Sequence, residues 1–151
     1  MDTVYNYNQQ LALSKNLSGR AFLTKLDSAG RTVWKRYTTT LNLHYSALLS
    51  VDITQDGGYI TAGYGERSMG PSDSGQLYVA KYSNTGNRLW EKTYGGSGID
   101  KANHVIQASD GSFMVAGTTA SVNGDVTGNH SMGYTDAWVL KLSSSGDIIR
   151  S

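Results

Sequence analysis

Residues 77–90, Leu-Tyr-Val-Ala-Lys-Tyr-Ser-Asn-Thr-Gly-Asn-Arg-Leu-Trp, contain two apolar segments joined by a polar turn with glycine. The same pattern begins at residue 21 and again at residue 137, with its lysine at 25, 81 and 141, so the copies lie 56 and 60 residues apart. A second block, Asp-Gly followed by an apolar segment ending in Ala-Gly, occupies 56–63 and 110–117. Matching blocks in the same order indicate a tandem repeat.

The apolar segments have the composition and length of β-strands. They are rich in Val, Ile, Leu, Tyr, Trp and Thr and are bounded by turns with glycine, and no stretch keeps a helical period over three turns. The expected strands are 21–27, 32–38, 47–55, 58–65, 76–83, 88–94, 103–109, 112–119, 136–142 and 147–150, with one more at 3–7. Glycine accepts the positive φ of a tight turn. We therefore expect turns at Gly30, Gly57, Gly86, Gly111 and Gly146.

Composition limits the class of protein. The 151 residues suit about one domain, and Lys plus Arg (13) against Asp plus Glu (12) leaves a net charge of +1. No nucleic-acid partner is expected, because that mode of binding needs a clustered basic face. No apolar run reaches the ~18 residues of a membrane span, so no membrane insertion is expected. The absence of cysteine excludes disulfides and zinc-thiolate sites.

Four antiparallel strands per repeat form a sheet with two apolar faces, which it cannot bury alone, so such sheets stack. We expect an all-β β-propeller of four-stranded antiparallel blades in a single domain, 1–151. Its expected parts are an N-terminal strand or linker at 1–20, a blade at 21–75, a second at 76–135 and a half blade at 136–151. That makes about two and a half blades per chain.

Two resemblances accompany this architecture. Residues 77–90 resemble the strand-turn-strand of tryptophan-docking propellers, a group that includes quinoprotein repeats. This resemblance implies a set of structural docking residues, Trp34, Trp90, Gly30 and Gly86. The unit 90–138 is more closely similar to propeller-like repeats of bacterial cell-surface and secreted proteins, except that the first copy has Thr-Thr-Thr-Leu-Asn at 38–42 in place of Gly-Gly-Ser-Gly. It implies a secreted or cell-surface location, although Met1-Asp2-Thr3 does not open a signal peptide.

The blade count bears on assembly. Propellers commonly have four to eight blades, so two and a half blades do not close a ring. Either the chain is a piece of a longer protein, or copies associate and complete the half blade. Two complete blades per chain plus one composite blade per junction would give a six-bladed dimer, in which exposed strand edges are paired. We favour this homodimer.

We assign no catalytic or cofactor-binding residue from the sequence. The repeat accounts for the aspartates expected in turns, Asp27, Asp56, Asp110 and Asp147. A glycosidase needs two carboxylates that flank a sugar, and Asp52 and Asp100 could provide them only through the fold. The three histidines, His44, His104 and His130, lack the spacing of a zinc site. No nucleophile motif is present.

One cluster has the oxygen-rich composition of a cation site. Residues 123–130 place oxygen-bearing side chains at alternate positions, and the calcium candidates are Asn123, Asp125, Thr127 and Asn129. The cluster resembles the first half of a calcium loop, but its twelfth position is Tyr134 and not a bidentate glutamate. The alternative is an Asx-rich turn that caps a hairpin.

These features favour a non-catalytic module for ligand or protein binding or for scaffolding. Its variable surface is expected in the loops 38–46, 64–76, 95–102 and 118–135. Tyrosines outside the repeated apolar positions are candidates for glycan or protein contacts, namely Tyr5, Tyr7, Tyr45, Tyr64 and Tyr134. The alternative is a glycan-active enzyme, a hydrolase or lyase, on a propeller scaffold. A quinoprotein dehydrogenase would need a full ring around its cofactor.

Overall fold

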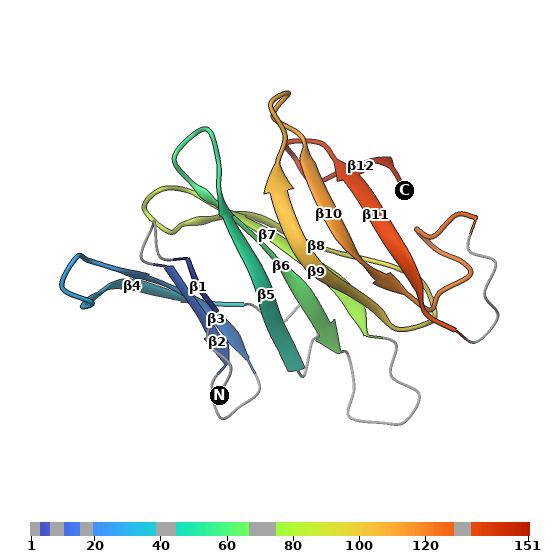
Figure 1. The fold of residues 1–151 in the computed structure, drawn as a ribbon, viewed down its shortest axis with the longest axis horizontal. Helices are drawn as coiled ribbons and strands as arrows, with labels where there is room; N and C mark the ends of the chain where they lie inside the picture. Colours follow the sequence, from blue (N-terminus) through green and yellow to red (C-terminus); the bar gives the residue numbers. More distant parts are fainter. Residues whose placement is uncertain (1–3, 7–10, 16–19, 39–44, 67–74, 129–133) are drawn as a thin grey trace.

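The computed structural model describes residues 4–6, 11–15, 20–38, 45–66, 75–128 and 134–151, and within these ranges the chain forms twelve strands and no helix. They make three antiparallel four-stranded sheets in chain order (Figure 1). The first sheet contains β1 (Val4–Asn6), β2 (Leu11–Lys15), β3 (Ala21–Leu26) and β4 (Thr32–Tyr37). The second contains β5 (Tyr45–Ile53), β6 (Tyr59–Glu66), β7 (Gln76–Tyr82) and β8 (Arg88–Tyr94). The third contains β9 (Asp100–Gln107), β10 (Phe113–Thr119), β11 (Asp136–Leu142) and β12 (Ile148–Arg150).

The structure confirms the predicted all-β class and the antiparallel four-stranded sheets. The ten strands expected after residue 20 are all present, with ends that differ by at most three residues. The short strand expected at 3–7 is β1, at 4–6. Sequence reasoning missed β2, because the residues before it, Tyr-Asn-Gln-Gln at 7–10, lack the Asp-Gly signal found in the other two copies.

The structure corrects the expected grouping of strands. β11 and β12, the half blade expected at 136–151, complete the sheet that begins with β9 and β10. The boundaries expected at 75/76 and 135/136 therefore fall inside the second and third sheets. A repeat period fixes the spacing between equivalent strands but not where a sheet begins. With β2 counted, the described residues hold three complete sheets and not two and a half.

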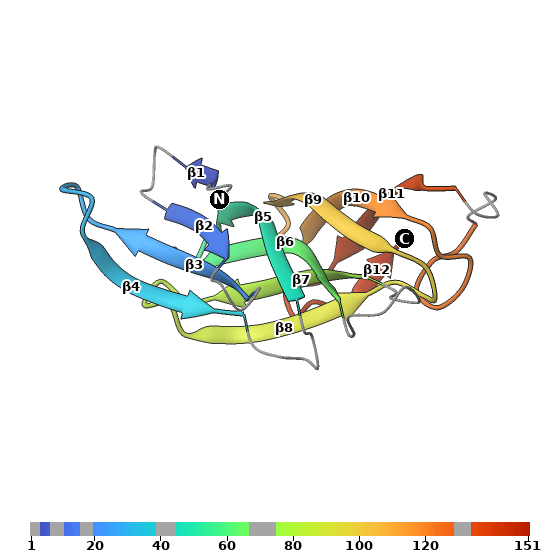
Figure 2. The same ribbon diagram turned by 90° about the horizontal axis from the view of Figure 1, so that it is seen from below.

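The three sheets pack face to face, with β5 across β2 and β3, and β9 across β5, β6 and β7 (Figures 1 and 2). The first interface is formed by Ala21, Leu23, Leu48, Tyr59, Tyr78, Ala80 and Tyr82. The second is formed by Ile60, Ala62, Leu77, Val79, Tyr94, Ala102, Val105, Phe113, Val115, Val126, Trp138, Leu140 and Leu142. Successive residues of a strand point to opposite faces. Every residue of β7 is therefore buried, because both faces of the second sheet are covered.

Among the described residues, one end of the stack carries five turns of one design, and we call it the turn end. The turns are 27–31, 54–58, 83–87, 108–112 and 143–147. In each, the N–H of the first residue donates to the carbonyl of the fifth, and the N–H of the fourth donates to the carbonyl of the first. The fourth residue is always glycine, with φ between +74° and +82°. This confirms the five predicted turn glycines, because only glycine takes this φ without steric cost.

At the opposite end, which we call the loop end, the strands are joined by the connections 16–20, 38–44, 67–75, 95–99 and 120–135. The repeated Ala-Gly pairs also have a structural reason. Gly63 and Gly117 face bulges in β5 and β9, where a Cβ would overlap the carbonyl oxygen of Ala47 or Lys101. Close backbone approach therefore requires glycine at both places.

Candidate functional site

Trp34 joins the first sheet to the second. It lies on β4, and its ring covers the turn glycine Gly86, where a Cβ would lie 2.8 Å from the indole. The same ring packs edge to face on Tyr59 of β6, with centroids 5.5 Å apart. A tryptophan on the fourth strand of one sheet thus rests on the last turn of the next.

Trp90 repeats this arrangement between the second and third sheets. A Cβ at Gly146 would lie 3.0 Å from its indole, and its ring packs edge to face on Phe113 at 5.9 Å. Its Nε1 also donates to the carbonyl of Ser144 at 3.0 Å. The remaining docking candidate, Gly30, has the same turn conformation, but nothing lies within 4 Å of a Cβ placed there.

Polar side chains next to each tryptophan hold the same turn. Arg36, two residues after Trp34, donates from Nε to the carbonyl of Gly86 at 2.8 Å. At the second junction Tyr94 donates to the carbonyl of Gly146 at 2.6 Å, and Lys92 pairs with Asp147 at 2.7 Å. These charge-assisted or buried bonds fix the position of the turn against the indole.

Two of the three repeated lysines pair with the Asp-Gly aspartate of the same sheet. Lys81 Nζ lies 2.9 Å from both oxygens of Asp56, and Lys141 Nζ lies 2.7 Å from Asp110. The lysine hydrogen bond is the main reason that the pKa of each carboxyl lies well below its usual value. Both aspartates also accept a backbone N–H two residues on. The repeated carboxylates are thus turn-forming groups.

The loop end of the third sheet is built around a buried carboxylate, Asp100. Its Oδ1 accepts the Thr119 hydroxyl at 2.5 Å, and its Oδ2 accepts the Ser121 hydroxyl at 2.8 Å and the N–H of Gly96 at 2.9 Å. A Cβ at Gly95, whose φ is +138°, would overlap this carboxylate. The glycine-rich segment 95–98 therefore closes over a satisfied buried charge.

The calcium candidates serve the same loop. Asn123 Oδ1 and Asp125 Oδ2 each accept a backbone N–H of the glycine-rich segment, at 2.9 and 3.0 Å. The Thr127 hydroxyl lies 3.1 Å from that of Ser151, and Asn129 is outside the described residues. Oxygens already bonded to N–H donors favour the Asx-rich turn. Within the described ranges, no three His, Cys, Asp or Glu side chains gather as a metal site would require.

The two carboxylates considered for glycoside cleavage lie at opposite ends of the stack. Asp52 accepts the N–H of Ile53 at 2.9 Å and that of Gln107 at 3.2 Å, next to the turn end. Asp100 stands at the start of β9, at the loop end. In the repeat, Asp52 of β5 corresponds to Ile106 of β9, which lies six residues beyond Asp100. Six residues of strand span about 20 Å. Retaining and inverting glycosidases need about 5 to 9.5 Å, so the fold does not bring this pair together.

Aromatic side chains from two neighbouring strands meet at the loop end. Tyr45 at the start of β5 and Tyr64 near the end of β6 have ring centroids 6.0 Å apart. Lys101 of β9 places its ammonium 4.5 Å from the centre of the Tyr64 ring. Burial, followed by the hydrogen bond with Tyr45, raises the pKa of Tyr64 to about 12. The cluster presents aromatic surface, neutral hydroxyl groups and one cation.

Sequence reasoning singled out both tyrosines of this cluster but missed Lys101. The signal was a departure from the repeat, because the equivalent position of β5 is Ala47. Tyr134 is exposed, Tyr5 lies on β1, and Tyr7 is outside the described residues. A hollow of about 320 Å³ lies at the same end, between the end of β10, residues 126–128 and the start of β11.

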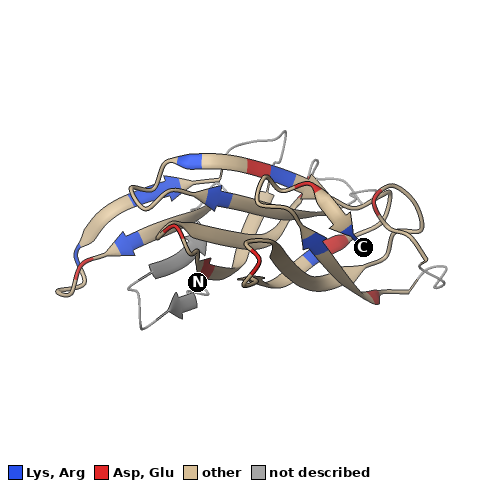
Figure 3. Ribbon diagram, turned by 90° about the horizontal axis from the view of Figure 1, so that it is seen from above, with Lys and Arg blue, Asp and Glu red and all other residues tan. Residues whose placement is uncertain are grey.

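Only one of the three histidines lies within the described residues. His104 Nδ1 lies 3.1 Å from the Ser50 hydroxyl, while His44 and His130 are outside the described residues. Figure 3 shows that positive and negative residues are interspersed along the strands. In the part of the chain that the structure describes, no helix is long and apolar enough to span a membrane.

Comparison with known proteins adds no family to these observations. No protein-family model matches the chain, and no curated protein is significantly similar to it.

Proposed function

We propose that the three sheets are blades of a β-propeller and that the chain is a non-catalytic module for ligand or protein binding or scaffolding. Two junctions support the architecture, because they have equivalent contacts: Trp34 rests on Gly86 at the first and Trp90 on Gly146 at the second. The resemblance to repeats of bacterial cell-surface and secreted proteins points the same way and suggests that location. Rigid blades with variable loops at one end are a common way to build a binding surface.

The observation that carries the binding function is the cluster of Tyr45, Tyr64 and Lys101 at the loop end. It lies on β5, β6 and β9, where two blades meet. Tyrosine combines apolar surface with a hydroxyl at low entropic cost, and it is enriched at recognition surfaces. A glycan or a protein loop offers the apolar and hydroxyl groups that fit such a surface.

Self-association completes the proposed architecture. Closed propellers have four to eight blades, and two copies with three blades each would supply six. The composite blade expected from the sequence is not needed, since each described sheet already has four strands.

The binding function is tested with defined oligosaccharides and peptides on an array, followed by titration of any hit. Tyr64→Ala and Lys101→Ala should each weaken binding at least about fivefold, the loss of a contact worth 1 kcal/mol. Leu89→Ala, an exposed apolar residue of β8 near the turn end, is the control and should bind normally. Binding that survives both loop-end variants would refute this site. Cleavage of a bound glycan, abolished by Asp52→Asn or Asp100→Asn, would favour the enzyme alternative.

A further inference from the structure

The outer face of the third sheet is apolar, although no described residue covers it. Val139 is 53% exposed and Ile106 44% exposed, and Met114, Ala116 and Ala137 lie beside them on β10 and β11. The equivalent face of the second sheet is covered by the third sheet. Its residues at the corresponding places of β6 and β7 have no exposed surface: Ile60, Ala62, Leu77 and Val79. The outer face of the third sheet is thus equivalent to the face of the second sheet on which another sheet packs.

The outer face of the first sheet is the complementary half. Phe22, Thr24 and Leu26 of β3 stand where β7 has Tyr78, Ala80 and Tyr82, and those three are buried against the first sheet. Beside this face lies Gly30, the turn glycine on which no indole rests. Both internal turns at this place hold a tryptophan. The first sheet therefore offers an empty docking position of the same design.

Charge distinguishes these two outer faces from the internal junctions. Arg150 pairs with Lys141 in the sheet register, as Trp34 pairs with Lys25 and Trp90 with Lys81. The docking position of the third sheet therefore carries a guanidinium in place of an indole. The turn that would receive it begins with Asp27, whereas both internal turns begin with serine. At the outer faces, arginine thus replaces tryptophan and aspartate replaces serine, so the two replacing residues carry opposite charges.

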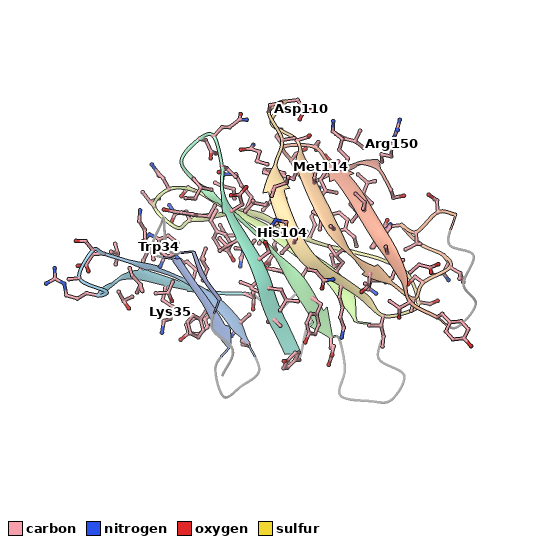
Figure 4. The ribbon with its side chains drawn as sticks, in the orientation of Figure 1. Trp34, Lys35, His104, Asp110, Met114 and Arg150 are labelled. Carbon is pink, nitrogen blue, oxygen red and sulfur yellow. The ribbon has the colours of Figure 1, made fainter. Side chains whose placement is uncertain are left out.

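We propose that the occupant of the third sheet's outer face is the first sheet of a second copy, with Arg150 of one chain over Gly30 and beside Asp27 of the other. Applied twice by two-fold symmetry, this contact joins three sheets to three. Asp27 already accepts the guanidinium of Arg31 at 2.8 Å, and a carboxylate has acceptor sites for a second donor. Figure 4 shows Trp34 on the first sheet and Arg150 on the third, on opposite sides of the stack. This inference rests on the propeller architecture proposed above and specifies its seam.

Sedimentation velocity at micromolar concentration tests the seam. The unmodified chain should be a dimer. The Val139→Asp variant should be a monomer, because dimerisation would bury an unpaired carboxylate. Leu89→Asp is the matched control: Leu89 is 57% exposed, but it lies on β8, away from the seam, so this variant should stay dimeric. Circular dichroism checks that each variant is folded. A folded, monomeric parent chain, or a Val139→Asp variant that dimerises normally, would overturn the inference.

A double-mutant cycle then tests the charged pair. Arg150→Gln and Asp27→Asn should each weaken the dimer about three- to fivefold, and together no more than either alone. The two residues lie on the first and third sheets, so such coupling reports contact between chains. The double variant Arg150→Trp with Asp27→Ser should remain dimeric, because it restores the combination of residues found at both internal junctions. Additive effects of Arg150→Gln and Asp27→Asn, or a monomeric Arg150→Trp/Asp27→Ser variant, would contradict the pairing. Ligand binding by a monomeric chain would refute the seam and leave the loop-end function standing.

Discussion

The first junction and the second junction share their indole docking and differ in their polar support. Trp34 and Trp90 rest on equivalent glycines and on equivalent aromatic rings of the second strand. At the loop end the equivalent positions diverge. Ser46 at the first junction accepts the N–H of Ala21 at 3.1 Å, whereas at the second Asp100 binds three donors. The docking contact is thus the constant part of the junction, and the loop-end network varies with the loops that it holds.

The largest expected effect comes from removing the constant part. Trp90→Ala should lower the free energy of unfolding by about 3 kcal/mol and Trp34→Ala by about 2 kcal/mol. Each variant loses a large aromatic contact, and Trp90→Ala also loses the hydrogen bond that Nε1 donates to the carbonyl of Ser144. Urea denaturation measures both. Trp34→Phe and Trp90→Phe are the controls that keep an aromatic ring. Equal losses in the two alanine variants would show that the indole N–H contributes nothing.

The variable part should separate the junctions more sharply. Asp100→Ala should cost about 2 to 3 kcal/mol, because it leaves buried donors without an acceptor, while Ser46→Ala should cost about 1 kcal/mol. Hydrogen exchange should show the loss of Asp100 at residues 95–98 and 119–121 first. If Ser46→Ala is as costly as Asp100→Ala, the two polar networks are equivalent despite their different chemistry.

The turn glycines allow strain to be separated from docking. Gly30→Ala should cost about 1 kcal/mol, the price of a left-handed conformation with open space around it. Gly86→Ala and Gly146→Ala should cost about 1 to 2 kcal/mol more, because the added methyl meets an indole at 2.8 or 3.0 Å. Thermal unfolding of the three variants provides the comparison. Equal costs would show that the tryptophans yield without loss. The parent chain and the three variants should be compared at a concentration low enough for all four to be monomeric, so that a change at Gly30 reports folding and not association.

The ion pairs should show a smaller difference. Asp56→Asn leaves Lys81, whose side chain is 6% exposed, without its carboxylate, and should cost about 1 kcal/mol. Asp110→Asn leaves Lys141, whose side chain is 36% exposed and can be hydrated, so its cost should be less. Denaturant titration in low and high salt measures both. A larger loss for Asp110→Asn would contradict this order.

Acid should weaken both sheets gradually. The pKa values of Asp56 and Asp110 lie below their usual value in the folded chain, so the folded state holds these protons less tightly than the unfolded state. The resulting stabilisation is complete above the unfolded pKa near 4 and is lost as pH falls toward the folded pKa. Asp56→Asn should reduce the slope of stability against pH between about pH 4 and 2. An unchanged slope would exclude Asp56 as a contributor.

The strands and turns could be predicted from the sequence because each depends on a local signal that the repeat multiplies. Gly57 and Gly111 mark the same hairpin turn, and the aromatic residue two places after each, Tyr59 or Phe113, packs against a tryptophan. The grouping of strands into sheets could not be predicted. The repeat period gives the spacing of equivalent strands, but which four strands share one sheet depends on the hydrogen bonds between them. The roles of Asp100 and Lys101 also remained open. Both residues interrupt the repeat, and only the fold shows which loop or ring each one meets.

The two ends of the stack differ in how freely they can change length. At the turn end, each of the five described turns has five residues, and two of them contact an indole, so an added residue in those two would shift a docking contact. The connections at the loop end run from five residues (95–99) to sixteen (120–135) over the same strand framework. For protein engineering, foreign segments should therefore be grafted at the loop end. The contacts of Gly86 and Gly146 with the indoles at the other end would keep the spacing between the sheets.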